Sequence, residues 1–197
     1  MAEHVEAEVK YGVLPVSHRL SKYEQLVVTS RVKECESAPD ALRRRQVFGT
    51  FDTDRPTSYS LTDLKDLAGV RILAFPSSRL ADINRVLRKR FPSWQADPVV
   101  ENGRLLAFKY SGYCQASDKV RGEYQIVSTL IGLFWEVEHA AIYKPAPELK
   151  GIARDVGVRE RISEAYRALG AFEEEFEAQI AQILEVHRRR RRRRRSI

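Results

Sequence analysis

Three segments with the pattern of β-strands alternate with helical segments along this chain. Val70–Phe75 is an apolar run interrupted only by Arg71 and ended by Pro76, Leu105–Tyr110 is a second strand-like segment, and Gly122–Val127 is a third. Segments of helical periodicity follow the first and the third of these. Sheets and helices must bury their apolar faces against one another, so this alternation predicts an α/β or α+β domain.

Four segments have helical periodicity. A mostly helical stretch covers residues 17–46, with Ser21 as its cap, and a second helix begins at Ser78. A third, over residues 129–143, is almost wholly apolar in its first half and is expected to be deeply buried. The last is long, covers residues 158–186, and has one apolar stripe that fits a helix covering the sheet and equally a helix packed in a dimer. The stripe consists of Val158, Ile162, Tyr166, Leu169, Phe172, Phe176, Ile180 and Ile183.

The net charge of +7 is concentrated at the C-terminal end. It arises from 34 basic and 27 acidic residues, and eight of the basic ones are consecutive, from Arg188 to Arg195. Without them the balance is 26 − 27, or −1. Like charges in a row repel, so residues 188–197 are predicted to be a disordered tail, either a handle for nucleic acid or a solvated end. We therefore expect a domain over residues 1–150, a helical extension over 151–187, and this tail.

The composition excludes several classes of protein. The chain has two cysteines, Cys35 and Cys114, which are too few for a disulfide framework and match no zinc pattern. There is no run of 18 apolar residues, and the N-terminus lacks the features of a secretory signal. We expect a reduced, cytoplasmic setting and no membrane partner.

Two carboxylates stand out near the strands. Glu123 and Gln125 are two apart on the third strand and therefore share one face of it. A carboxylate on a core-like strand needs a metal, a base or an ion pair as its partner. Asp66 lies just before the first strand and could join Glu123 in holding Mg²⁺, or could simply pair with Arg71.

Basic and aromatic residues form a third group. Arg31 and Lys33 are two apart, and Lys109 precedes Gly112 and Tyr113. Such cations beside Mg²⁺ suit a polyphosphate, the glycine permits close approach of the backbone, and the tyrosine ring can stack on a nucleobase. A solvated basic face with a turn tyrosine is the alternative. His139, four residues after Trp135 on the apolar helix, is expected to give structural support near the site.

These motifs in this order resemble a known family. The segments are 65–73, KDLAGVRIL; 109–113, KYSGY; 123–129, EYQIVST; and Glu138-His139 up to Tyr143-Lys144. Over residues 17–150 they look like the synthetase domain of RelA/SpoT proteins. The chain resembles the small single-domain alarmone synthetases, including the toxin-like members of that group.

The resemblance implies a nucleotidyltransferase-like mixed β-sheet flanked by helices. It implies transfer of the β,γ-pyrophosphate of ATP to the 3′-hydroxyl of GDP or GTP, which makes guanosine tetra- or pentaphosphate. Asp66 would hold Mg²⁺, Glu123 would help hold it or take the 3′-hydroxyl proton, and Gln125 would orient this group. Tyr113 would stack on the acceptor base. The residues implied in binding nucleotide and phosphate are Arg31, Lys33, Ser37, Arg71 and Lys109.

Two positions depart from the family pattern. Ala41 stands where the family usually has a lysine, and Ser117 where it usually has a histidine. These departures touch phosphate and acceptor contacts rather than the two carboxylates. The acceptor is therefore left open between a guanosine nucleotide, an adenine nucleotide and the 3′ end of tRNA recruited by Arg188–Arg195. A nucleotide-binding protein without catalysis is a further alternative.

Overall fold

The computed structural model describes residues 2–33, 38–39, 41–42, 64, 66–101, 103–114, 117–143 and 158–195. The chain divides into two compact units, Met1–Val127 and Ser128–Ile197. The functional division at residue 150 stays a prediction. Among the described residues, no helix combines the length and the apolar character that a membrane span requires.

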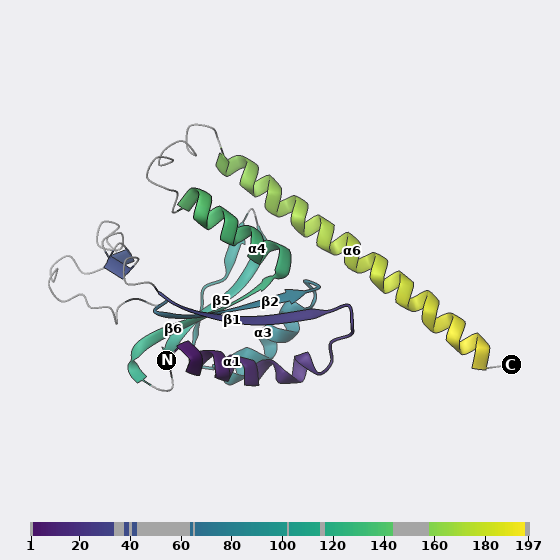
Figure 1. Ribbon diagram of the computed structural model, residues 1–197, viewed down its shortest axis with the longest axis horizontal. Coiled ribbons are helices and arrows are strands. Elements are labelled where there is room, and N and C mark those ends of the chain that lie inside the picture. Colours follow the sequence, from purple (N-terminus) through teal and green to yellow (C-terminus); the bar gives the residue numbers. More distant parts are fainter. Residues whose placement is uncertain are drawn as a thin grey trace. The chain divides into compact units, whose positions relative to one another are not determined.

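Unit 1 is built on a six-stranded sheet, shown in Figure 1. The strand order is β1-β2-β6-β5-β3, and β4 also pairs with β5. The pairs β1–β2 and β5–β6 are antiparallel. The strands are β1 (Gln25–Val32), β2 (Ala68–Phe75), β3 (Gln95–Ala96), β4 (Val99–Glu101), β5 (Arg104–Cys114) and β6 (Ser117–Ser128).

The central pair, β2 and β6, runs in one direction. A β-carbon built on Gly122 would lie 3.2 Å from the carbonyl oxygen of Ala68. The side chain of Arg71 reaches that of Gln125. Both contacts keep an offset of 54 residues (122 − 68 and 125 − 71), as parallel neighbours do. The sheet is therefore mixed, as predicted.

One face of this sheet is covered by two helices, α1 (Ala2–Ser17) and α3 (Arg79–Arg90). Every second residue of β2 is buried, which is the alternation of a strand with one face in the core. The buried cluster joins residues of both helices to the sheet. It includes Val5, Val9, Val13 and Val16 from α1, Ile83 and Leu87 from α3, and Val70, Ile72, Ala74, Tyr110, Tyr124 and Ile126 from the strands. The opposite face carries polar side chains beside buried apolar ones such as Ala107 and Val127.

The N-terminal part of the chain corrects one prediction. Residues 25–32 form strand β1, whereas the sequence predicted a helix over 17–46. The three- and four-residue spacings there were a weaker signal than the β-branched run Val27-Val28-Thr29, which suits a pleated strand. Sequence analysis also missed α1, although its four buried valines recur at spacings of four and three residues.

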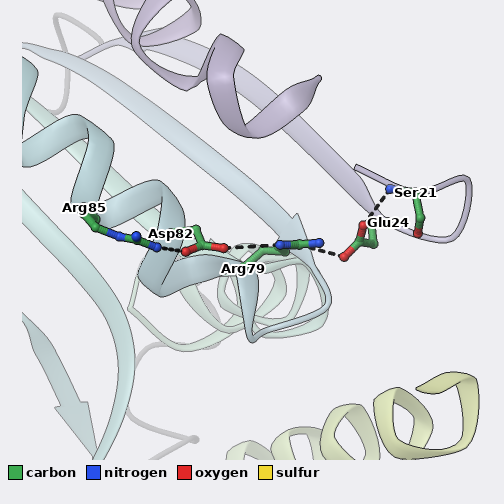
Figure 2. Close-up of polar contacts among 5 residues, drawn as sticks. All are labelled: Ser21, Glu24, Arg79, Asp82 and Arg85. Carbon is green, nitrogen blue, oxygen red and sulfur yellow. Dashed lines mark hydrogen bonds and ion pairs between the residues drawn. The ribbon is translucent and has the colours of Figure 1, made fainter. Parts of the chain in front are cut away.

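A series of polar contacts, drawn in Figure 2, connects the first turn of α3 to the turn that precedes β1. Glu24 accepts hydrogen bonds from the backbone N–H of Ser21, at 2.6 Å, and from Arg79 Nε, also at 2.6 Å. Arg79 in turn pairs with Asp82 at 3.2 Å, and Asp82 with Arg85. The predicted helix after Ser78 is confirmed, and its first turn is anchored by these contacts.

Unit 2 contains α4 (Thr129–Glu138), the π-helix η2 (His139–Tyr143) and α6 (Val158–Arg195). Glu173 accepts a hydrogen bond from the N–H of Leu130 at 3.4 Å, and the Tyr166 hydroxyl donates to Glu138. These contacts join the start of α4 to a later part of α6 and the end of α4 to an earlier part. The two helices therefore run antiparallel.

Helix α6 extends further than expected. Its backbone is helical through Arg195, whereas the sequence predicted disorder from residue 188. Arginine has a high helix propensity, and adding residues to an existing helix avoids the cost of nucleation. An ion pair between Arg189 and Glu185, four residues apart, supports the transition into the arginine run.

Candidate active site

The sheet face opposite α1 and α3 carries the polar residues predicted from the sequence. In the β5–β6 ladder, Lys109 lies opposite Gln125, and Ser111 lies opposite Glu123. Directly opposed residues of an antiparallel pair share a face, so all four side chains are on one side. The alternating residues Tyr124 and Ile126 point into the core, as the strand period requires.

A continuous row of polar contacts crosses this face. Arg71 Nε on β2 lies 3.4 Å from Gln125 Oε1, and Gln125 Nε2 donates to Glu123 Oε1 at 2.6 Å. Lys109 Nζ on β5 lies 3.1 Å from Glu123 Oε2 and 3.4 Å from Asp97 Oδ2. The row brings together residues from three strands that are far apart in sequence.

Glu123 is at the centre of this row and is almost fully buried. Its side chain is 8% exposed. One carboxylate oxygen is held by Gln125 and the other by Lys109, so the buried charge is compensated on both sides. The sequence-based requirement of a partner for Glu123 is met by an ion pair.

Lys109 is held by two carboxylates. Burial alone would lower its pKa, but the charges of Glu123 and Asp97 and their hydrogen bonds outweigh burial and raise the pKa above the ordinary value of 10.5. The backbone N–H of Asp97 also donates to the Lys109 carbonyl at 2.8 Å. The ammonium is therefore a fixed positive charge beside Glu123 at neutral pH.

Asp66 and Lys33 form a second charged pair. Their side chains make an ion pair, and the backbone N–H of Lys33 donates to the Leu67 carbonyl at 3.0 Å. These contacts prolong the β1–β2 ladder beyond its last register pair, Val32 with Ala68. The second predicted carboxylate is thus positioned just before the strand that carries Arg71.

Arg31 lies opposite Gly69 in the β1–β2 ladder. A β-carbon built on Gly69 would lie 3.5 Å from Arg31 Cγ and 3.6 Å from its Nε. The arginine side chain therefore crosses the space above the glycine. Because residues 25–32 are a strand, Arg31 shares a face with Arg71, which a helix would not have ensured.

The ring of Tyr113 is available to a ligand. The residue is 57% exposed, and the guanidinium of Arg121, its partner in the β5–β6 ladder, lies 5.4 Å from the ring centroid. Its neighbour Gly112 has a different role from the one predicted. A β-carbon there would lie 2.5 Å from Trp94 Cδ1, so the glycine makes room for a core tryptophan rather than for a ligand.

Four further positions were singled out in the sequence. Ser37 lies outside the described residues. Ala41 packs with Ala38 and Leu64 in a small apolar cluster, so this position is apolar. Ser117 begins β6, and His139 begins η2 in unit 2.

Sequence reasoning missed Asp97 and Arg121. Arg121 could have been found from its spacing of two residues from Glu123, which places both on one strand face. No local signal marks Asp97, because its role comes from the pairing of a distant loop with β5.

Among the described residues, no three or more His, Cys, Asp or Glu side chains gather into a metal site. Mg²⁺ does not require such a cage, because it is commonly bound by one or two carboxylates together with substrate phosphates. Asp66 and Glu123 supply oxygen donors of the right kind, and each is already held by a lysine. By their chemistry, these carboxylates suit a magnesium ion that arrives with a nucleotide.

Comparison of the fold with solved structures agrees with these features. The small alarmone synthetase 1 from Bacillus subtilis matches with a TM-score of 0.61 and 20% identity, covering 92% of this chain and 92% of that one. This chain has the fold of the small alarmone synthetases. The same enzyme bound to its product pppGpp matches with a TM-score of 0.56 and 20% identity, over 91% of this chain and 92% of that one.

A GTP pyrophosphokinase family protein from Streptococcus pneumoniae also matches, with a TM-score of 0.55 and 16% identity, over 92% of this chain and 86% of that one. No protein-family model matches the sequence, and neither does any curated protein. The resemblance noted in the sequence is thus confirmed at the level of the alarmone synthetase fold.

Proposed function

We propose that this chain is a Mg²⁺-dependent pyrophosphotransferase that moves the β,γ-pyrophosphate of ATP to the 3′-hydroxyl of GDP or GTP. The observation that carries the proposal is the buried Glu123 carboxylate, held between Gln125 and Lys109 on the polar face of the sheet. The alarmone synthetase fold and the solved relative bound to pppGpp support the same conclusion.

In the proposed reaction, a bond forms between the 3′-oxygen of the acceptor and the β-phosphorus of ATP. The bond from that phosphorus to the α,β-bridging oxygen breaks, and AMP leaves with the oxygen. Glu123 accepts the 3′-hydroxyl proton or holds the metal, and Gln125 fixes the orientation of its carboxylate. Asp66 and Glu123 would hold Mg²⁺, which would supply neutralisation of the phosphate charge.

The cations of the same face are proposed to bind the phosphates. Arg31 and Arg71 lie on the strand face beside Glu123, and Lys33 and Lys109 are fixed by carboxylates. Such transfer depends on positioning and electrostatic stabilisation more than on covalent catalysis, which suits fixed cations. Tyr113, with its exposed ring, is proposed to stack on the acceptor base, and Ser37 to contact the nucleotide.

The acceptor could instead be an adenine nucleotide or the 3′ end of tRNA. The run Arg188–Arg195 favours tRNA, because clustered arginines bind nucleic-acid phosphates through counterion release. Transfer to tRNA would then fall steeply as salt is added. The apolar setting of Ala41 favours a third alternative, a protein that binds nucleotides without transfer.

The test is transfer of label from β- and γ-labelled ATP to GDP, GTP, AMP and bulk tRNA in separate reactions with Mg²⁺. The proposal predicts label on GDP or GTP, and loss of transfer when the metal is chelated. Label on tRNA or AMP alone would identify the alternative acceptor. Binding of ATP without transfer to any of the four would overturn the enzymatic assignment.

A further inference from the structure

Tyr113 is held by two contacts, one on each side of the sheet. On the polar face, Arg121 is its direct partner in the β5–β6 ladder, and the guanidinium carbon lies 5.4 Å from the centroid of the ring. On the core side, the indole N–H of Trp94 donates a hydrogen bond to the Tyr113 carbonyl at 3.2 Å. The ladder register shifts directly after Tyr113, so regular strand pairing alone does not fix this residue.

The side chain of Arg121 makes no polar contact within the described part of the chain. It is half-buried, and among the described residues none forms an ion pair with its guanidinium or accepts a hydrogen bond from its buried Nε. A buried donor without an acceptor is destabilising, and such groups are rare in folded proteins. The contact with the Tyr113 ring therefore has to account for the arginine at this position.

A second arginine–tyrosine contact in unit 1 shows how a structural arginine differs. The guanidinium carbon of Arg90 lies 5.5 Å from the centroid of the Tyr11 ring, and Tyr11 is likewise exposed. Arg90 also donates to the carboxylate of Glu8 at 2.8 Å, which connects α3 to α1. The charge of Arg90 is thus neutralised within the fold, whereas the charge of Arg121 lies over a ring alone.

Arg121 and Tyr113 belong to the sheet face that carries Glu123. Arg121 is two residues from Glu123 on β6, and Tyr113 is two residues from Ser111, which lies opposite Glu123. The Tyr113 side chain is 57% exposed in spite of the arginine. A flat ligand therefore has access to the part of the ring that the guanidinium does not cover.

We propose that Arg121 is a positioning residue for the acceptor, because its guanidinium holds the Tyr113 ring in the orientation in which the acceptor base stacks on it. The inference rests on the proposed function, in which this ring binds the base. A cation over one face attracts the π electrons of the ring. Their repulsion with the π electrons of a base on the other face is then reduced, so the stack is strengthened as well as oriented. Arg121 acts through Tyr113 and does not contact the acceptor.

Direct contact of Arg121 with a phosphate of the acceptor is the alternative, since an arginine without a carboxylate partner suits an anion. The position of the guanidinium over the ring favours the positioning role. The two roles have different requirements. A phosphate contact does not need the tyrosine, and it contributes nothing to the binding of a nucleoside.

The test is the affinity of the full chain for GDP and for guanosine, measured by equilibrium dialysis with labelled ligand. Arg121→Met keeps the length of the side chain and removes its charge, and it is expected to weaken the binding of both ligands about tenfold. Arg121→Lys keeps the charge but not the planar group, and it is expected to weaken both about threefold. The matched control, Arg90→Met, removes the cation beside Tyr11 and is expected to leave both affinities unchanged.

Three results of this measurement would overturn the proposal. A loss of affinity for GDP alone would assign Arg121 to a phosphate. Unchanged affinities in Arg121→Met would show that the ring does not need the arginine. A parent chain that binds neither GDP nor guanosine would show that Tyr113 does not bind the base.

Removal of the ring provides a second test. In a chain that already carries Tyr113→Leu, Arg121→Met is expected to cause no further loss of affinity for GDP, because Arg121 acts through Tyr113. A further loss as large as the loss in the parent chain would contradict the proposal. Circular dichroism and thermal unfolding check that each variant is folded.

Transfer kinetics separate this inference from the proposed function. Arg121→Met is expected to raise the KM for GDP about tenfold and to leave the KM for ATP and kcat within about twofold, which a general folding defect would not do. Normal transfer with an unchanged KM for GDP would overturn this inference alone. Binding of GDP that depends on Arg121, without any transfer in the parent chain, would overturn the proposed function and support the positioning role.

Discussion

Lys109 Nζ lies 3.1 Å from Glu123 Oε2, although the two residues are diagonal rather than direct partners in the β5–β6 ladder. The direct partner of Lys109 in the ladder is Gln125. Gln125 donates a hydrogen bond to the other carboxylate oxygen of Glu123. One buried acid is thus fixed by both neighbours on its face. This arrangement makes the electrostatics of the candidate site testable one residue at a time.

Replacement of Glu123 tests the role of the carboxylate. Glu123→Gln keeps the shape and removes the charge, so pyrophosphate transfer is expected to fall by about 100-fold or more. Lys109 keeps its other partner, Asp97, so the chain is expected to remain folded. Initial rates and thermal unfolding of the same preparation give both readouts.

The matched control is Asp97→Asn, which removes the exposed carboxylate that also pairs with Lys109. It is expected to change the rate by a few-fold at most, because exposed ion pairs contribute little. A normal rate in Glu123→Gln would mean that the site is placed wrongly.

Loss of the lysine tests the ion pair itself. Lys109→Met leaves the buried Glu123 without its cation and is expected to lower the free energy of unfolding by about 2 kcal/mol at neutral pH. The carboxylates beside Lys109 raise its pKa above 10.5 in the folded chain. The stabilisation that the charged lysine gives to the fold is therefore complete below pH 10.5, and it is lost only as the pH rises through the higher pKa of the folded state. Urea unfolding of both proteins across this range measures the difference. A difference that disappears at neutral pH would contradict this account.

Two glycines of the sheet are expected to respond differently to alanine. A β-carbon at Gly112 would lie 2.5 Å from Trp94 Cδ1, so Gly112→Ala must displace the tryptophan and is expected to cost about 2 kcal/mol of stability. At Gly69 the nearest atom, Arg31 Cγ, is 3.5 Å away, which is ordinary contact. Gly69→Ala is therefore expected to change stability by less than about 1 kcal/mol. The urea concentrations at the unfolding midpoints of the two variants measure this difference. Equal losses of stability in Gly112→Ala and Gly69→Ala would contradict the prediction.

The acid limit of stability depends in part on Glu24 (Figure 2). Burial alone would raise its pKa, but hydrogen bonds from Arg79 and Ser21 outweigh it, and the pKa is lowered from 4.5. Its contribution is therefore present above pH 4.5 and is lost as the pH falls through the lower folded value. Glu24→Gln is expected to reduce stability by about 1 kcal/mol at neutral pH and to flatten the loss in acid. An unchanged acid profile would show that other carboxyls set it.

The strands and helices with strong local patterns were predictable from the sequence. The strands at 70–75, 105–110 and 122–127 are confirmed as β2, β5 and β6, each extending further than expected. The prediction failed at β1, because a short strand and a helix can share a few apolar spacings. The common face of Glu123 and Gln125 followed from the strand period alone.

The amino-acid sequence by itself determined the alternation of strands and helices, the pairing of polar positions on β6, and the charge blocks of α6. These are local properties, set by spacing along the chain. Only the tertiary structure decided that Asp97 pairs with Lys109 and that Gly112 leaves space for the Trp94 ring. It also decided that part of the apolar stripe of α6 stays exposed. Such contacts depend on strand register and on which surfaces pack together, and these are set by the burial of the whole core rather than by any one segment.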